Sequence, residues 1–412
     1  MAGSTIDHLI SVIVFLGALL VFISLFNQMI QTAILYQRHR YLATKCSDLL
    51  DNILLNPGIP ADWGKNSTRT LCGFGLQDPE FTQYRLSPFS LMRLLSSSGE
   101  KVYYSRTGEW YSNVSWGIGG GYFLLQESEC INYSLASKLL GINGTYGFQL
   151  AITPTVNVSI VEDKNVASYL RLNITVMGQG SPLAGASVDY LMFWMDSSEP
   201  VRNSTRTDSL GFAYLDFNGA NGLPRIEVSQ NKTAYMFIAK ASLGGLHGIG
   251  YLSREIVTKA GNIIPFVENY GNGTVGTVLL AHKWGKNDPG PGDSQAALFF
   301  NATFYVLPDS FSPIKNVTVE GHVTYGERLD YYPLQIPTSQ VGYLVVTYWT
   351  GREYGMVVMP WGIGTIGFSV VFGGDPSGQE WVVTDVRQVL VGDIAYQARL
   401  ALWSLEGYGV VG

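Results

Sequence analysis

Charged residues are scarce in this sequence of 412 residues. Only 14% of the chain is Asp, Glu, Lys or Arg, whereas a typical soluble domain carries about 25%. The net charge is −6, and 46% of the residues are hydrophobic. A disordered chain needs low hydrophobicity and high net charge, and a nucleic-acid-binding protein needs a basic footprint. The composition therefore argues against both classes, and the length indicates two or three domains.

Catalytic and metal-binding signatures are also missing from the sequence. It contains no G-x-S-x-G, no two His at i and i+4, and no C-x-x-C. Weaker candidates are all Gly-rich or acidic turns: the formal G-x-G-x-x-G at 271–276, the pairs Glu127/Glu129 and Glu162/Asp163, and Asp288 with Asp293. None has the surrounding pattern that nucleotide, glycoside or Ca²⁺ chemistry requires. The sequence predicts a non-enzymatic protein without cofactor or metal.

The first 37 residues hold no Lys or Arg, and their only charged side chain is Asp7. Within them, residues 9–26 read LISVIVFLGALLVFISLF. As a helix this run spans roughly 27 Å, close to the roughly 30 Å of a bilayer core. A secretory signal peptide would need basic residues before the run and a cleavage site of small residues after it, and both are absent. A buried core helix is the other alternative, but a retained single membrane span, in contact with lipid, is the better interpretation.

The same helix is predicted to continue beyond the membrane. Residues 27–55 contain neither Pro nor Gly, and the sequence NPGIP at 56–60 then ends the helix. Apolar residues recur at helical spacing in this second half: Leu42, Cys46, Leu49 and Ile53. We expect one helix of about 50 residues, apolar in its first half and amphipathic in its second, with the apolar stripe packed against the globular part.

Eleven N-x-[S/T] sequons occur among the twenty Asn residues, at Asn66, Asn113, Asn132, Asn143, Asn157, Asn173, Asn203, Asn231, Asn272, Asn301 and Asn316. At average usage of Ser and Thr, about three would arise by chance. All eleven follow residue 60. A sequon accepts a glycan only in a translocated chain. The other interpretation is that Asn and Thr are simply common in turns and strands.

The side of the membrane is decided by these sequons against a conflicting signal. Arg38, Arg40 and Lys45 follow the apolar run, and the positive-inside rule would place that flank in the cytoplasm. The number of sequons outweighs three charges, so we predict a single-pass cell-membrane protein with residues 57–412 extracellular. In an oxidising compartment, Cys72 and Cys130 are candidates for a disulfide.

The remainder of the chain reads as mainly β. Short strand-like segments alternate with turns, for example YFLLQ at 122–126, LRLNITV at 170–176, and two segments flanking Gly392-Asp393 near the end. The fold class expected is a long N-terminal transmembrane and amphipathic helix followed by two or three β-sandwich-type domains. The expected divisions are a membrane and stalk helix at 1–56, a first β-rich head domain at 57–164, a β-sandwich at 165–258 and a C-terminal β domain at 259–412. Whether the last strands pair with 57–164 stays open.

Two stretches of the middle part carry a resemblance to known modules. The strand PLAGASV at 182–188, followed by TDSLGFAYLDF at 207–217, resembles the carboxypeptidase-regulatory-like and bacterial Ig-like surface modules. The resemblance covers roughly 170–245. It implies a β-sandwich that acts as a spacer or adhesive module.

The N-terminal part carries a second resemblance. An apolar helix that continues as an amphipathic helix, followed by LLDNILLNPGIPADWG at 49–64 and GFGL at 73–76, resembles archaeal type IV pilin-like secreted proteins. The resemblance implies processing by a class III signal peptidase just ahead of the apolar stretch. Met1-Ala2-Gly3 would then be a very short leader, with cleavage between Gly3 and Ser4.

The sequence leaves three functional hypotheses. The first is a pilin-like subunit that forms or decorates a glycosylated surface filament, with copies of itself or other pilin-like subunits as partners through the N-terminal helix. The second is a monomeric, signal-anchored adhesin or envelope protein, and the third is a surface hydrolase with an Ig-like accessory module. Because 57 of the 58 charged residues lie beyond residue 37, the apolar helix does not explain the low charge. A weakly charged outer part fits a surface covered by glycans or by neighbouring subunits.

Overall fold

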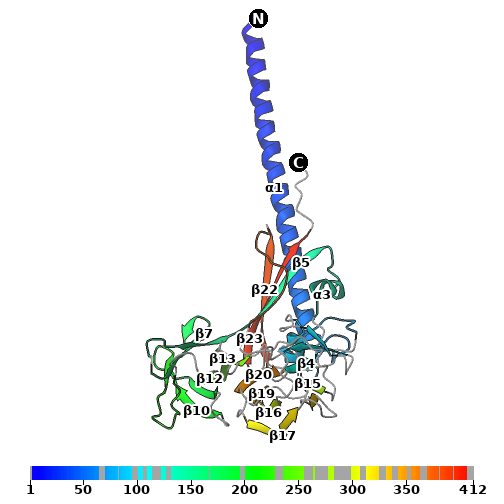
Figure 1. Cartoon of the computed structure of the whole chain (residues 1–412). Coiled ribbons are helices and arrows are strands. Elements are labelled where there is room, and N and C mark those ends of the chain that lie inside the picture. The colour runs from blue at the N-terminus through cyan, green and yellow to red at the C-terminus, as the bar shows by residue number, and fades with distance from the viewer. Residues whose placement is uncertain are drawn as a thin grey trace.

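A long helix projects from a β-rich head in the computed structural model of the chain (Figure 1). The structure describes residues 2–64, 70–81, 83–94, 101–104, 109–113, 122–126, 131–166, 168–194, 200–227, 235–254, 263–264, 277–282, 298–306, 312–323, 331–335, 342–349, 354–361, 369–379, 381–392 and 394–405. The predicted fold class, mainly β with one long apolar N-terminal helix, is confirmed.

The helix α1 (Ala2–Leu55) is 54 residues long and ends where Asn56-Pro57 was predicted to end it. The residue before a proline is disfavoured in the helical conformation, so α1 cannot continue through Asn56. Among the described residues of the head, two segments form short helices. Ser87 caps α2 (Pro88–Met92), which begins with the proline in its first turn, and Asn132 caps α3 (Tyr133–Leu139). The sequence pattern did not predict α3.

The second half of α1 packs on a five-stranded sheet, which we call the spine sheet. In spatial order its strands are β1 (Arg85–Leu86), β22 (Val382–Val391), β23 (Ile394–Ser404), β5 (Tyr146–Pro154) and β21 (Val370–Gly373). β22 and β23 form a hairpin in which Val391 pairs with Ile394, as the Gly392-Asp393 signal predicted. Gly392 has a φ of +60°, the left-handed conformation that such two-residue turns require.

The spine sheet joins segments that are far apart in sequence. β23 pairs with β5 in antiparallel fashion from Ser404 opposite Tyr146 to Tyr396 opposite Pro154. The last strands of the described chain therefore pair with a strand of residues 57–164. Between β5 and β21 the chain leaves the spine sheet and forms the strands from β6 to β20.

The chain after α1 folds back onto the end of the helix. Ile59 donates its N–H to the carbonyl of Gly73 at 2.9 Å, and the N–H of Leu76 reaches the carbonyl of Ile53 at 2.8 Å. A Cβ on Gly75 would lie 2.1 Å from the carbonyl oxygen of Asn56, so only glycine permits this approach. The two segments at 49–64 and 73–76 thus pack against each other at the junction of helix and head.

Residues 156–254 form a β-sandwich beside the spine sheet (Figure 1). One sheet contains β6 (Val156–Glu162), β7 (Leu170–Gly178), β8 (Ser181–Pro182) and β11 (Phe212–Phe217); the other contains β9 (Ser187–Trp194), β10 (Val201–Arg206), β12 (Tyr235–Leu243) and β13 (Leu246–Arg254). The ring of Phe217 meets that of Phe237 edge-on across the two sheets, with centroids 6.4 Å apart. Thr207 Oγ1 donates to the carbonyl of Leu183 and accepts from the N–H of Ala186, which joins the PLAGASV and TDSLG segments.

One edge of the sandwich is closed by direct contact between β6 and β13. A Cβ on Gly250 of β13 would lie 2.2 Å from the carbonyl oxygen of Val158 on β6. Glu162, at the end of β6, accepts a hydrogen bond from the Tyr235 hydroxyl at 2.9 Å and pairs with Arg254 at 3.2 Å. Burial, followed by the charge of Glu162, raises the pKa of Tyr235 well above its usual range. The phenol therefore stays protonated and keeps donating.

The remaining described strands form two further five-stranded sheets. One contains β14 (Ile263–Ile264), β20 (Tyr354–Trp361), β19 (Gly342–Trp349), β16 (Leu298–Val306) and β17 (Ser312–Val323); the other contains β18 (Tyr331–Gln335), β15 (Thr277–His282), β4 (Tyr122–Gln126), β3 (Glu109–Asn113) and β2 (Lys101–Tyr104). Because β4 pairs with β15, the second of these sheets combines strands from 57–164 and 259–412. Phe193 of the sandwich contacts Tyr305 of β16 with ring centroids 5.4 Å apart.

Candidate functional site

The first half of α1 is an apolar surface with nothing packed on it in the described structure. Every side chain described from position 6 to position 34 is exposed. The large hydrophobic residues are bare on all sides of the helix, with Leu16 50% exposed and Leu20 67% exposed. By length and composition, α1 can cross a membrane once. Gly3 and Ser4, the candidate cleavage positions, lie in the first turns of this helix.

The second half of α1 has its apolar stripe buried, as the helical spacing predicted. Leu42 and Leu49 are nearly inaccessible, and Cys46 and Ile53 are completely buried. Leu50 and Leu54 are completely buried as well. They pack into the same core as the inward-facing residues of β22 and β23. This half of the helix therefore shares the hydrophobic core of the head.

A polar clamp, consisting of Ser47, Asp51, Asp385 and Arg387, fixes this half of α1 to β22. Arg387 Nε donates to Asp51 at 3.0 Å, its Nη2 donates to Ser47 Oγ at 2.9 Å, and its Nη1 donates to Asp385 at 2.6 Å. Hydrogen bonds to Asp51 and Asp385 raise the pKa of Arg387. Burial acts to raise the pKa of Asp385, but hydrogen bonds from Val386 N–H, Arg387 and Ser47 outweigh it, and the net pKa is lowered. Both groups thus stay charged at neutral pH.

The two described cysteines differ in burial and therefore in reactivity. The Cys46 thiol lies 3.4 Å from the carbonyl oxygen of Leu400, and burial, reinforced by the charge of Asp385, raises its pKa to about 11. A protonated, buried thiol is a poor nucleophile. Cys72 is exposed. Cys130 lies outside the described residues, so the Cys72–Cys130 disulfide stays a prediction.

The sequons occupy different environments. Asn132, Asn143, Asn157 and Asn203 are exposed, and Asn173 and Asn301 are half-buried. Asn113 and Asn316 lie on β3 and β17, with side chains outside the described set, and Asn66, Asn231 and Asn272 lie outside the described residues altogether. Exposure gives a transferase access to the four exposed amides.

Two sequon residues have additional roles or constraints. The side-chain oxygen of Asn132 accepts a hydrogen bond from Leu135 N–H at 2.7 Å and so caps α3. A glycan is linked through the amide nitrogen, which leaves this oxygen free to keep the cap. The Asn173 side-chain oxygen is buried without a hydrogen-bond partner. Asn173 is therefore a less accessible acceptor than Asn132.

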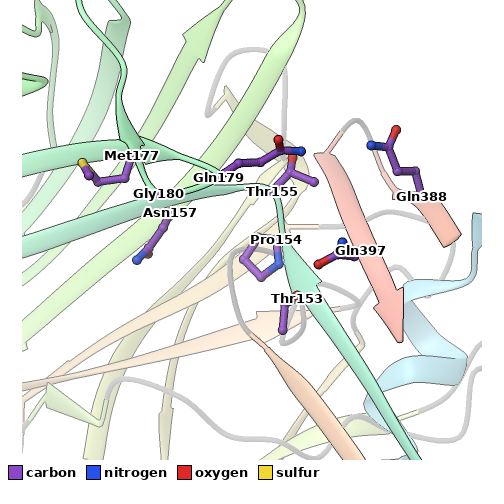
Figure 2. A pocket seen from close by; sticks show the side chains of 9 residues that line it. All are labelled: Thr153, Pro154, Thr155, Asn157, Met177, Gln179, Gly180, Gln388 and Gln397. Atoms are coloured by element: carbon purple, nitrogen blue, oxygen red, sulfur yellow. The ribbon is translucent and has the colours of Figure 1, made fainter. Parts of the chain in front are cut away.

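A cavity of about 610 Å³ lies where the spine sheet meets the sandwich (Figure 2). Its floor is the outer face of the spine sheet. Gln388 of β22 is the cross-strand neighbour of Gln397 on β23, and Gln397 is the neighbour of Thr153 on β5. The three polar side chains thus form a row across three adjacent strands. The volume falls within the range of about 300–1,000 Å³ that is typical of small-molecule sites.

The wall of this cavity comes from the sandwich. Asn157 of β6, Met177 of β7 and the turn at Gln179 and Gly180 line it. Gln179 has a φ of +50°, and its N–H donates to the carbonyl of Thr155 at 3.2 Å. A non-glycine residue in this conformation costs about 1–2 kcal/mol, and the hydrogen bond to Thr155 holds the turn against the β5–β6 connection. We call this cavity the amide pocket, because four of its lining residues are Gln or Asn.

The acidic residues considered as catalytic or metal-binding candidates form structural contacts wherever they fall within the described residues. Glu162 pairs with Tyr235 and Arg254, and Asp163 accepts from Asn165 and lies 4.0 Å from Arg171. The pair Glu127/Glu129, the Gly-rich run at 271–276, and Asp288 with Asp293 lie outside the described residues. Within the described ranges, no group of three or more His, Cys, Asp and Glu is arranged to hold a metal ion.

The amide pocket was missed by sequence reasoning. Gln388, Gln397, Thr153 and Gln179 lie on four separate segments, and each alone reads as an ordinary exposed polar residue. Only Asn157 carried a signal, and that signal was a sequon.

No protein-family model matches the sequence, and no curated protein shows a significant match to it.

Proposed function

We propose that this chain is a non-enzymatic, membrane-anchored extracellular protein of the pilin-like type. Its N-terminal helix crosses the membrane and also packs with the helices of other subunits in a surface filament. The head, residues 57–412, faces outward and carries glycans. This proposal joins the N-terminal and sandwich resemblances in one architecture.

The observation that carries the proposal is the division of α1 into two surroundings. One half is clamped to the spine sheet, and the other is apolar on all sides and exposed. A large exposed apolar surface is unfavourable in water and marks a site of contact with lipid or protein. Because the helix is unbroken, the head and the apolar half form one rod-like unit, which is the form that a filament core of bundled helices requires.

The sequons support an extracellular head. Four of those described are exposed, and they are distributed over α3, the turn before β5, β6 and β10. Glycans at these positions would also compensate for the low charge of the head by keeping its surface hydrated.

A charge placed in the apolar half tests the anchor. An Asp at the centre of a spanning helix costs about 2.5–3.5 kcal/mol on insertion scales, so Leu16→Asp should strongly reduce the membrane-bound fraction of the full-length chain. Thr44→Asp, on the exposed side of the clamped half, is the matched control and should leave that fraction unchanged. The measurement is partition between carbonate-washed membranes and supernatant. Wild-type protein found entirely in the supernatant would contradict the anchor.

Shearing of intact cells tests the filament. The pilin-like proposal predicts wild-type protein in the sheared fraction, with a mature N-terminus at Ser4 by mass spectrometry. Protein that begins at Met1 and stays in the membrane as a monomer would instead favour the signal-anchored adhesin or envelope protein. Glycopeptide mapping tests the coat separately, because native protein with most of its eleven sequons unmodified would rule it out.

A further inference from the structure

We propose that the amide pocket binds a neutral saccharide. The pocket has the size of a small-ligand site and is lined by residues of both the spine sheet and the sandwich (Figure 2). None of its nine lining residues carries a formal charge. Phosphates, carboxylates and cations would find no opposite charge there, so the ligand class that fits is polar and uncharged.

Amide side chains match the hydroxyl groups of a sugar in hydrogen-bonding capacity. Each carboxamide offers two donors and an acceptor with two lone pairs, and each sugar hydroxyl is both donor and acceptor. The side-chain amides of Asn157, Gln179, Gln388 and Gln397 have no hydrogen-bond partner in the described structure. Four unused carboxamides that surround one cavity are therefore available to a ligand rich in hydroxyl groups.

The row of Gln388, Gln397 and Thr153 gives the floor a defined spacing. These residues stand at one level on three adjacent strands, and neighbouring strands lie about 4.8 Å apart. This spacing is comparable to the width of a pyranose ring, so successive hydroxyl groups of one or two rings can meet successive side chains. Because the strands belong to a packed sheet, the backbone positions from which these side chains project are set before the ligand arrives.

The opposite wall supplies a fixed amide and an apolar contact. The N–H of Gln179 donates a hydrogen bond to the carbonyl of Thr155. This bond fixes the backbone position from which the Gln179 side chain projects. Met177 and Pro154 add apolar surface, which the C–H faces of a sugar ring can cover. The pocket thus combines a few oriented polar groups with apolar contacts, as ligand sites do.

The saccharide has two sources. One is the glycan of this chain itself, because Asn157 is both a sequon and a lining residue; this source rests on the proposed glycosylation. The other is a free or cell-surface glycan of another molecule. Both sources would present the same hydroxyl groups to the pocket. The variant Asn157→Gln distinguishes them, because it removes the glycan acceptor but keeps a side-chain amide that can hydrogen-bond.

The experiment measures binding of the full-length protein, in detergent, to an array of neutral gluco-, manno- and galacto-oligosaccharides, with sialylated and sulfated oligosaccharides as anionic controls. We expect neutral probes alone to bind, either to the wild type or, where the chain's own glycan fills the pocket, to Asn157→Gln. The double variant Gln388→Leu/Gln397→Leu should lower that affinity at least tenfold. Thr384→Leu, on the same exposed face of β22 but outside the pocket, is the matched control and should not change it. Far-ultraviolet circular dichroism checks that each variant is folded.

The Asn157→Gln variant and the glycan at Asn157 show which of the two sources supplies the saccharide. If the chain's own glycan fills the pocket, Asn157→Gln gains binding to free neutral probes. Enzymatic removal of the glycan at Asn157 is then at least tenfold slower than at Asn203, and Gln388→Leu/Gln397→Leu abolishes that protection. If the source is another molecule, wild type and Asn157→Gln bind the probes equally. Binding that is anionic only, binding that the double variant retains in full, or no binding together with an unprotected Asn157 glycan would each overturn the proposal. None of these outcomes depends on membrane anchoring or filament assembly.

Discussion

The two halves of α1 obey the same local rules and have opposite surroundings. In the half from Leu42 to Leu55 the apolar residues form one stripe, and the spine sheet covers it. In the half from Ile6 to Ile34 apolar residues stand on every side, and no described residue covers them. An apolar stripe with charges beside it indicates that the chain itself supplies the partner. An apolar surface all round, left bare by the described residues, is the kind of surface that contacts lipid or another protein.

The largest expected effect on stability comes from truncating a leucine to alanine in each half of α1. Leu50→Ala leaves a cavity at the helix–sheet interface and should lower the free energy of unfolding of the head by about 2–5 kcal/mol. Leu20→Ala removes the same atoms from an exposed position and should change it by less than about 0.5 kcal/mol. Urea unfolding followed by tryptophan fluorescence in detergent measures both. Equal effects would mean that the two halves are not energetically distinct.

The polar clamp should contribute less than the buried stripe. Arg387 and Asp51 are partly exposed, with 26% and 37% of their side-chain surfaces accessible. A double-mutant cycle with Arg387→Leu and Asp51→Asn should give a coupling energy of about 0.5–1 kcal/mol. A coupling of zero would show that hydrophobic burial alone fixes the helix to the head. The corresponding cycle between Arg387 and exposed Asp48 is the control, because Asp48 is not part of the clamp.

The smallest effect is the dependence of the clamp on pH. The pKa of Asp385 is lowered in the folded protein from its ordinary value of 3.8. Its stabilising contribution is therefore fully present above the unfolded pKa and is lost as the pH falls through the folded pKa. The difference in unfolding free energy between wild type and Asp385→Asn should shrink as the pH is lowered from 5 to 2. A difference that stays constant would show that Asp385 contributes to stability independently of its charge.

The sandwich shows how far a strand pattern predicts its surroundings. β7 alternates between buried and half-exposed residues, and its segment was predicted as a strand because of that alternation. β9 and β12 bury residues on both faces, including Leu191 and Ile238. A continuous apolar run fits a strand covered on both faces, but the sequence does not say what the second layer is. The structure supplies it through contacts such as Phe193 with Tyr305.

Local signals predicted the helix and several turns, because those features depend on neighbouring residues. The end of α1 at Leu55 and the β22–β23 hairpin belong to this group. The helix α3 was not predicted, although its N-cap, Asn132, is a residue type that favours the start of a helix. A capping residue and a sequon share the same side chain, and the sequence does not distinguish the two uses.

The sequence by itself determined the long helix, its division into an apolar and an amphipathic half, and the mainly β character of the head. These follow from periodicity and helix-ending residues, which act over a few positions. Only the tertiary structure placed Arg387 beside Asp51 and brought Gln388, Gln397 and Thr153 into one row next to Asn157. Strand register and sheet order bring such residues together across hundreds of positions, and register is fixed by the packing of the whole sheet. The clamp and the amide pocket are therefore properties of the folded head, whereas the apolar segment, long enough to cross a membrane, is evident from the first 37 residues of the chain.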